Sequence, residues 1–176
     1  MDIPNLIAGS IRRAVAEVFA TMLSVELGPG ELVNDPALPE PPEGVVSFIG
    51  LAGPWVGTGT IMCTPALACR VCSQMLMTEA ASVNEEVLDA VGELTNMVIG
   101  SVKNDLEKEL GPLGLSIPTV IFGRNFKTKS TAASEWVVER FRWDGDEFLI
   151  KLCLAKNEKH AAPQPIGHTL PVDVKV

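Results

Sequence analysis

The residue pair with the clearest chemical potential is Glu93 and Asn96, which stand three positions apart within residues 84–110. Apolar residues recur through this stretch at intervals of three and four, which predicts a long amphipathic helix. At about 100° per residue, Glu93 and Asn96 are neighbours on the face opposite the apolar stripe. We therefore expect a carboxylate and a carboxamide to point together into solvent, where both can contact one bound molecule.

The residues around this pair indicate a surface that another protein approaches. Gly92 and Gly100 interrupt a helix of otherwise good helix formers, and each glycine costs about 1 kcal/mol relative to alanine. Small residues at these positions allow a second backbone to come close. Asp89 shares the polar face, and Met97 at its edge offers an adaptable apolar contact. We expect these four residues to contact a partner, although an isolated Glu-x-x-Asn pattern more often only solvates a helix.

The longer string from residue 89 to residue 100, DAVGELTNMVIG, resembles the signature helix of the CheC/CheX/FliY family of chemotaxis phosphatases. Members of this family carry an acidic residue, two spacers and an asparagine, and this motif falls on Glu93 and Asn96. The chain has one such motif where a typical CheC has two, so it looks most like CheX. The order of expected helices and strands extends the resemblance loosely over residues 1–155.

The resemblance implies a partner and a reaction. The substrate would be a phosphorylated CheY-like response regulator, and the reaction would be hydrolysis of its phosphoaspartate. Asn96 would position the attacking water, and Glu93 would pair with a lysine of the receiver domain. The protein would need no cofactor of its own, because the receiver supplies the Mg²⁺. The alternative is a non-catalytic adaptor or flagellar-switch-type protein that docks a receiver through the same helix.

Composition limits the class of protein. The 176 residues are 47% hydrophobic and 20% charged, which predicts a folded domain and argues against disorder. The longest apolar runs are too short to span a bilayer, and the N-terminus has no signal-peptide pattern, so a cytoplasmic protein is expected. A net charge of −8 without a basic stripe argues against nucleic acid as a partner.

Two further amphipathic helices are predicted. The first covers residues 5–27, and the Gly-Pro-Gly at 28–30 is expected to end it. The second has Thr64 as its N-cap and Pro65 as its first residue, and it runs to about Thr78. Its expected buried residues are Leu67, Val71, Met75 and Leu76.

Strands are expected on both sides of the central helix. Residues 45–51 and 56–63 form a predicted hairpin, in which Gly57 and Gly59 indicate a bulge or a close backbone approach. After the central helix, the Trp-Asp-Gly-Asp at 143–146 is the clearest hairpin turn, and the strands around it should pair antiparallel. The remaining strand candidates are residues 116–123, 135–143 and 147–155.

A Cys-x-x-Cys at Cys69 and Cys72 invites a metal or redox interpretation. No second Cys-x-x-Cys follows, and the two histidines, His160 and His168, are far away in the C-terminal segment. The pair also lies inside a predicted helix, whereas a thioredoxin-like pair stands at a strand-to-helix turn. We therefore expect no metal site and free, buried thiols.

Three segments fall outside the expected elements. Residues 28–44 are rich in proline and predict a surface loop. Residues 124–134 are basic and hydroxyl-rich, which predicts an exposed loop, with a phosphate site as the lesser alternative. Residues 156–176 are expected to form a C-terminal extension to a domain of residues 1–155, and residues 169–176 could add an edge strand.

Together these elements predict an α+β fold, a two-layer domain with long helices packed on a largely antiparallel sheet, as in the CheC/CheX-like fold. Such packing leaves the Glu93 and Asn96 face outside. A convex helix suits a site that a partner protein completes, and the sequence shows no nucleophile–base pair, metal cluster or P-loop. Edge strands in the β-rich C-terminal half also predict a homodimer that leaves this face open.

Overall fold

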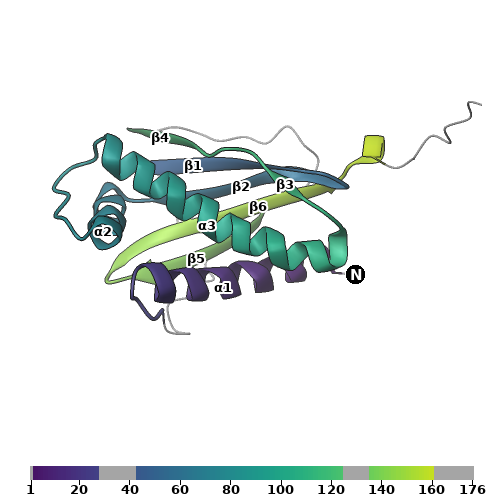
Figure 1. Ribbon diagram of the computed structural model, residues 1–176, viewed down its shortest axis with the longest axis horizontal. Helices are drawn as coiled ribbons and strands as arrows, with labels where there is room; N and C mark the ends of the chain where they lie inside the picture. The colour runs from purple at the N-terminus through teal and green to yellow at the C-terminus, as the bar shows by residue number, and fades with distance from the viewer. Residues whose placement is uncertain (1, 28–42, 125–134, 161–176) are drawn as a thin grey trace, which may run out of the picture.

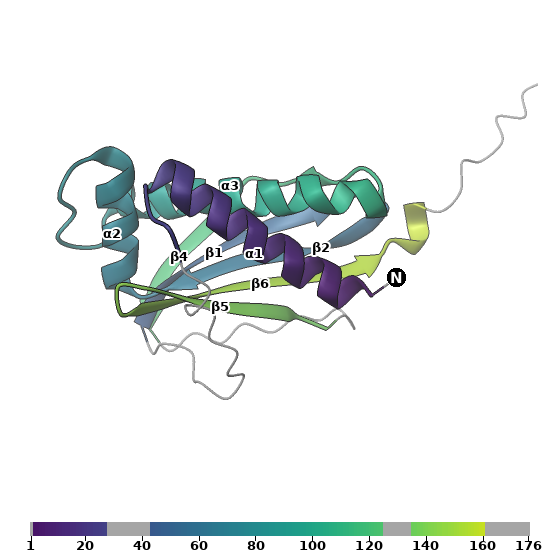
Figure 2. The same cartoon turned by 90° about the horizontal axis from the view of Figure 1, so that it is seen from below.

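The helices lie on one face of a six-stranded sheet, which confirms the predicted α+β, two-layer fold (Figures 1 and 2). The computed structural model describes residues 2–27, 43–124 and 135–160. The two long helices, α1 and α3, run side by side across the sheet, and the shorter α2 lies at one end of it. The elements are α1 Ile3–Met22, β1 Glu43–Ala52, β2 Trp55–Cys63, α2 Pro65–Leu76, α3 Glu85–Leu110, β3 Gly114–Leu115, β4 Thr119–Arg124, β5 Val137–Trp143, β6 Asp146–Lys156 and the 3₁₀ helix η2 Glu158–His160.

The sheet has the strand order β3-β1-β2-β6-β5, and β4 also pairs with β1. All five pairings are antiparallel. Both predicted hairpins are present, β1 with β2 and β5 with β6. The second hairpin turns at Asp144 and Gly145, whose φ angles of 52° and 89° are the positive values that a type I′ turn requires.

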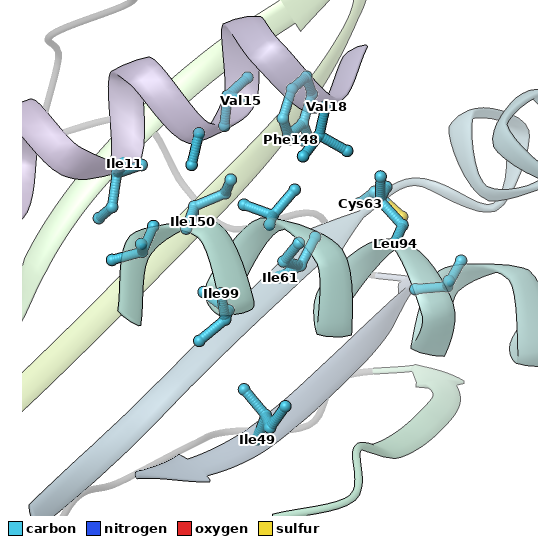
Figure 3. Packing of buried hydrophobic residues seen from close by; sticks show 14 of the residues in the cluster. Ile11, Val15, Val18, Ile49, Ile61, Cys63, Leu94, Ile99, Phe148 and Ile150 are labelled. Carbon is cyan, nitrogen blue, oxygen red and sulfur yellow. The ribbon is translucent and has the colours of Figure 1, made fainter. Parts of the chain in front are cut away.

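The core lies between the helices and the inner face of the sheet (Figure 3). Phe148 on β6 stacks between two aromatic rings, with ring centroids 5.0 Å from Phe19 on α1 and 5.2 Å from Phe141 on β5. Burial of these apolar faces is the main driving force that holds the two layers together. The labelled core residues are Ile11, Val15 and Val18 of α1, Leu94 and Ile99 of α3, and Ile49, Ile61, Cys63, Phe148 and Ile150 of the sheet.

Two glycines let neighbouring elements approach β2 closely. A Cβ on Gly57 would lie 1.9 Å from the carbonyl oxygen of Cys153 on β6, and a Cβ on Gly59 would lie 3.0 Å from Ile99 on α3. The expected close approach is therefore confirmed, while the alternative of a bulge is wrong because the registers with β1 and β6 run on without interruption. Gly59 in particular allows α3 to lie close to the sheet.

Helix α1 ends at Met22, five residues earlier than the predicted end at residue 27. Ser24 adopts a left-handed conformation with φ 55°, and the Val25 N–H donates to the Phe19 carbonyl oxygen at 3.0 Å. Ser24 therefore occupies the left-handed position directly after the helix end, where glycine is the usual residue. Because this position is a serine and not a glycine, the sequence pattern did not indicate the helix end.

Residues 116–123 do not form the single strand that was predicted. Residues 116–118 lie between the two-residue β3 and β4, and residues 119–123 belong to β4. Pro118 interrupts the run because it has no N–H to donate. Ser116 instead pairs with Gly50 of β1, donating its N–H at 2.9 Å and accepting the Gly50 N–H on its hydroxyl at 2.8 Å.

The predictions for residues 28–42, 125–134 and 161–176 lie outside the described residues.

Among the described helices, none is both long enough and apolar enough to cross a membrane.

Candidate functional site

The candidate site lies on α3, whose ends are fixed by local sequence. Asn84 is the N-cap, and its side-chain oxygen accepts the Val87 N–H at 3.0 Å. Glu85 and Glu86 occupy the first turn, where negative charge is favourable at the positive end of the helix dipole. Gly111 ends the helix with φ 84° and donates its N–H to the Glu107 carbonyl oxygen at 3.2 Å. The predicted long helix is therefore confirmed.

Helix α3 is tied to α1 by polar contacts along one side. Arg13 of α1 lies 2.6 Å from the Asp105 carboxylate, and the Ser101 hydroxyl donates to Glu17 at 3.3 Å. Lys108 first, and then Arg13, hold the pKa of Asp105 below its ordinary value by donating hydrogen bonds to its carboxylate. These contacts fix the rotation of α3 about its own axis.

A further contact ties the C-terminal end of α3 to the chain that follows. The Glu107 carboxylate accepts the Leu113 backbone N–H at 2.7 Å and binds the Lys103 ammonium at 2.9 Å. These two donors, the backbone N–H above all, lower the pKa of Glu107 from its ordinary value. The turn into β3 is thereby fastened to the last helical turns.

Glu93 and Asn96 are both exposed on the outer face of α3, as the helical pattern predicts. The two residues between them point inward. Leu94 is in the core, and Thr95 is fully buried with its hydroxyl donating to the Val91 carbonyl oxygen at 2.7 Å. Among the described residues, neither Glu93 nor Asn96 makes a side-chain hydrogen bond or ion pair with another side chain or backbone group. Both side chains are thus presented to a molecule from outside.

This arrangement has a defined chemical capacity. A carboxylate accepts hydrogen bonds and attracts a cation, while a carboxamide can donate to one group and accept from another. Because the helix is anchored along its whole buried side, both groups keep their spacing when a partner arrives. The pair can therefore hold a protein surface by charge and orient a small polar molecule such as water.

The four residues expected around the pair have different surroundings. Asp89 is exposed on the same face, and Met97 is half-buried against the core. Gly92 is buried, and a Cβ there would lie 3.3 Å from Val120 on β4. The chain's own strand therefore makes a close approach at Gly92, and a contact of Gly92 with a partner stays a prediction. Gly100 is half-buried, with Leu115 3.9 Å from a Cβ built on it.

A groove that the helical pattern does not predict lies beside the pair. It has a volume of about 300 Å³ and is lined by Met75 and Leu76 of α2 and by Glu86, Asp89, Ala90 and Glu93 of α3. We call it the α2–α3 groove. Leu76 was predicted to be buried but is 49% exposed. The run of three apolar residues at 75–77 indicates this exposure, because three consecutive positions at a helix end cannot all face the core.

The cysteines near α2 are free thiols, as predicted, with Cys63 and Cys72 buried and Cys69 half-buried. Burial raises the pKa of Cys63 to about 12, with Asp146 contributing less. Burial also raises the pKa of the Cys69 and Cys72 thiols. Thiols held in the protonated state are poor nucleophiles. Within the described ranges, no group of three or more His, Cys, Asp or Glu residues is placed to hold a metal ion.

Similarity to known proteins extends over most of this fold. A Thermotoga maritima protein named CheY-P phosphatase CheX is 30% identical over 73% of this chain and 80% of its own length. A CheX structure from Vibrio vulnificus superposes with a TM-score of 0.74 at 25% identity, covering 85% of this chain and 96% of the other. A chain of the CheX-CheY-BeF₃-Mg²⁺ complex from Borrelia burgdorferi has the same fold, with a TM-score of 0.72 at 24% identity over 85% of this chain and 98% of that one.

A family model supports the same relationship. Residues 45–142 match the model described as chemotaxis phosphatase CheX, and these residues include the whole of α3 with Glu93 and Asn96. Since the match spans more than half of the chain and the Thermotoga relative is 30% identical, the chain belongs to the CheX family of chemotaxis phosphatases.

Proposed function

We propose that this protein hydrolyses the phosphoaspartate of a CheY-like response regulator. The observation that carries the proposal is the exposure of Glu93 and Asn96 one turn apart on a helix whose opposite side is anchored in the core. The proposal is also supported by the family and by the Thermotoga relative's name. The receiver domain completes the site, because among the described residues neither side chain of the pair has a hydrogen-bond or ion-pair partner.

In this reaction Asn96 orients the attacking water through its carboxamide, in line with the bond that breaks. The water oxygen bonds to phosphorus, and the bond from phosphorus to the aspartate oxygen breaks with its electrons left on the carboxylate. The water protons pass to the released phosphate and to solvent. Glu93 pairs with a receiver lysine, so that docking and water placement share one rigid helix.

We place the Mg²⁺ of the reaction on the receiver, as its own ion, where it neutralises the phosphoryl oxygens. The Borrelia burgdorferi complex contains CheX, CheY, BeF₃ and Mg²⁺ together. The protein described here contributes the positioned amide and the docking carboxylate. We also place the reaction in the cytoplasm, where response regulators act.

The test is release of inorganic phosphate from autophosphorylated receivers of the same organism in the presence of Mg²⁺. We expect wild type to accelerate release from at least one receiver, and Asn96→Ala to lose roughly 10²-fold or more of that acceleration, the scale of a positioned catalytic group. The receiver should remain bound. Asn104→Ala, an exposed asparagine farther along the same helix, is the matched control.

Undiminished hydrolysis by Asn96→Ala would rule out the water-positioning role. If wild type binds a receiver and does not accelerate phosphate release, the protein is a docking protein or adaptor that uses the same helix.

The protein is further proposed to be a homodimer joined through a sheet edge. Strand β5 ends the strand order, and Val138 on it is an exposed apolar residue. Edge strands of this kind pair readily with a second copy. Helix α1 lies over β5, whereas the Glu93 and Asn96 face belongs to α3, so such a dimer leaves the pair accessible. Light scattering at tens of micromolar should give twice the chain mass, and a monomer mass would contradict this.

We retain one CheX-like domain over residues 1–155 with residues 156–176 as an extension. The proposal is supported by α1 and β6, whose residues share one core, and β6 ends one residue past the proposed boundary. Removal of residues 161–176 should leave cooperative unfolding and phosphate release unchanged.

A further inference from the structure

The α2–α3 groove shares one wall with the candidate site, because Glu93 belongs both to the exposed pair and to the lining of the groove. The groove is also lined by the apolar residues Met75 and Leu76 of α2 and Ala90 of α3. A molecule that covers Glu93 therefore also reaches the end of α2. The groove is continuous with the surface on which the receiver is proposed to dock.

The end of α2 exposes two large apolar side chains that are adjacent in sequence. Leu76 is 49% exposed, and Met77 directly after it is 94% exposed. Met77 is the C-cap residue and has φ 54°, a left-handed conformation in which glycine or asparagine is the usual choice. A large apolar side chain at this position gains nothing from the core of its own chain. Methionine at an exposed edge is typical of surfaces that adapt to a protein partner.

The polar lining of the groove carries a single sign of charge. Glu86, Asp89 and Glu93 are exposed carboxylates on successive turns of α3. They line the α3 side of the groove, next to the apolar side chains of α2, and the chain as a whole has a net charge of −8. The complementary surface is an apolar side chain flanked by lysine or arginine.

We propose that the receiver docked on Glu93 and Asn96 also inserts an apolar side chain, bordered by basic residues, into the α2–α3 groove. Leu76, which lines the groove, and Met77, which is exposed directly beside it, then set the affinity for the receiver and the choice among receivers, while they take no part in hydrolysis. This inference rests on the proposed function for the identity of the partner. It adds a docking site on α2 that determines specificity, separate from the residues assigned to the reaction.

The test is the double variant Leu76→Gln/Met77→Asn, which removes the apolar surface. Glutamine preserves helix propensity at the last helical residue, and asparagine tolerates the left-handed conformation, so the fold is retained. We expect KM for the phosphorylated receiver, and Kd for the receiver with BeF₃⁻ and Mg²⁺, to rise about tenfold or more, as when an apolar contact central to an interface is lost. The value of kcat should stay within about twofold of wild type. The variant loses a contact that the bound substrate and the transition state share equally, and it keeps every catalytic contact.

The matched control is Met22→Gln. Met22 is the last residue of α1, is 47% exposed and does not line the groove. We expect its KM and Kd to equal those of wild type. A second arm, Glu86→Gln/Asp89→Asn, tests the acidic rim, and its Kd should rise at low salt and converge on the wild-type value at high salt.

The outcomes separate this inference from the proposed function. If Asn96→Ala stops hydrolysis while the Leu76→Gln/Met77→Asn variant has unchanged KM and Kd, the inference is overturned and the function stands. If wild type binds the BeF₃⁻-loaded receiver without hydrolysing its phosphate, the function is overturned, and the Kd of the double variant still decides the inference. If the double variant turns a dimer into a monomer, the groove is a self-association surface and the inference is overturned. If wild type neither binds nor hydrolyses any receiver, both are overturned.

Discussion

Val120 on β4 packs against Gly92 on α3, the residue directly before Glu93, with Val120 Cγ2 only 3.3 Å from the position of a Cβ on Gly92. Strand β4 is itself paired with β1, where Val120 lies opposite Ser47. The sheet edge therefore supports the segment of helix that carries the exposed pair. A change of volume at Gly92 is transmitted to the site through this contact.

The two glycines of α3 should respond differently to the same substitution. Gly100→Ala should raise the free energy of unfolding by up to about 1 kcal/mol, because alanine favours the helix and the nearest side-chain atom would be 3.9 Å away. Gly92→Ala should raise the free energy of unfolding by less, because the added methyl group must displace Val120. Gly92→Val should lower stability by about 1–3 kcal/mol through overpacking. Urea unfolding of the three variants measures the order of their free energies of unfolding. Equal increases for the two alanine variants would contradict the packing assigned to Val120.

Glu93→Ala should weaken the complex with the receiver and also slow phosphate release, because the proposed lysine contact both docks and orients. Raising the salt concentration should reproduce part of this effect in wild type, since an exposed ion pair is screened. Kd values at low and high salt measure the effect on binding, and initial rates measure the effect on phosphate release. Glu109→Ala, an exposed glutamate near the other end of α3, serves as control. A salt-independent Kd in wild type, unchanged in Glu93→Ala, would exclude the ion pair.

Glu107 should contribute stability that depends on pH. Its pKa is lowered in the folded state by the Leu113 N–H and by Lys103. A lowered pKa stabilises the fold above the ordinary glutamate value of about 4.3, and the contribution is lost as the pH falls through the folded-state pKa. Glu107→Gln should therefore be less stable than wild type at pH 7, and the difference should shrink toward about pH 3. Urea unfolding across this range, with Glu109→Gln as control, measures it; a constant difference would show that the ionised carboxylate is not responsible.

The thiols of α2 should have no role in the reaction. Cys72→Ser places a hydroxyl in a buried site and should cost about 1–2 kcal/mol of stability. Cys69→Ser, at a half-buried position, should cost less. Phosphate release per folded molecule should equal wild type in both. Stoichiometric zinc in the purified protein, or loss of turnover in a folded serine variant, would contradict this expectation.

The sequence alone determined α3, its limits and its exposed pair. Asn84 and Gly111 act on the backbone next to them, and the three- and four-residue spacing of apolar residues fixes which side of a helix is buried. Because these effects are local, the outward orientation of Glu93 and Asn96 follows from the sequence. The turn at Asp144 and Gly145 was readable for the same reason.

Only the tertiary structure decided what surrounds the pair. Val120 reaches Gly92 because β4 joins the edge of β1, and Leu76 borders Glu93 because α2 packs against the first turns of α3. These contacts join segments that are far apart in the sequence, so the local spacing of residues does not predict them. The early end of α1 belongs to the same class, since Ser24 adopts a left-handed conformation that local preference disfavours. Local chemistry thus specified the side chains of the candidate site, and long-range packing selected the neighbours that a partner meets with them.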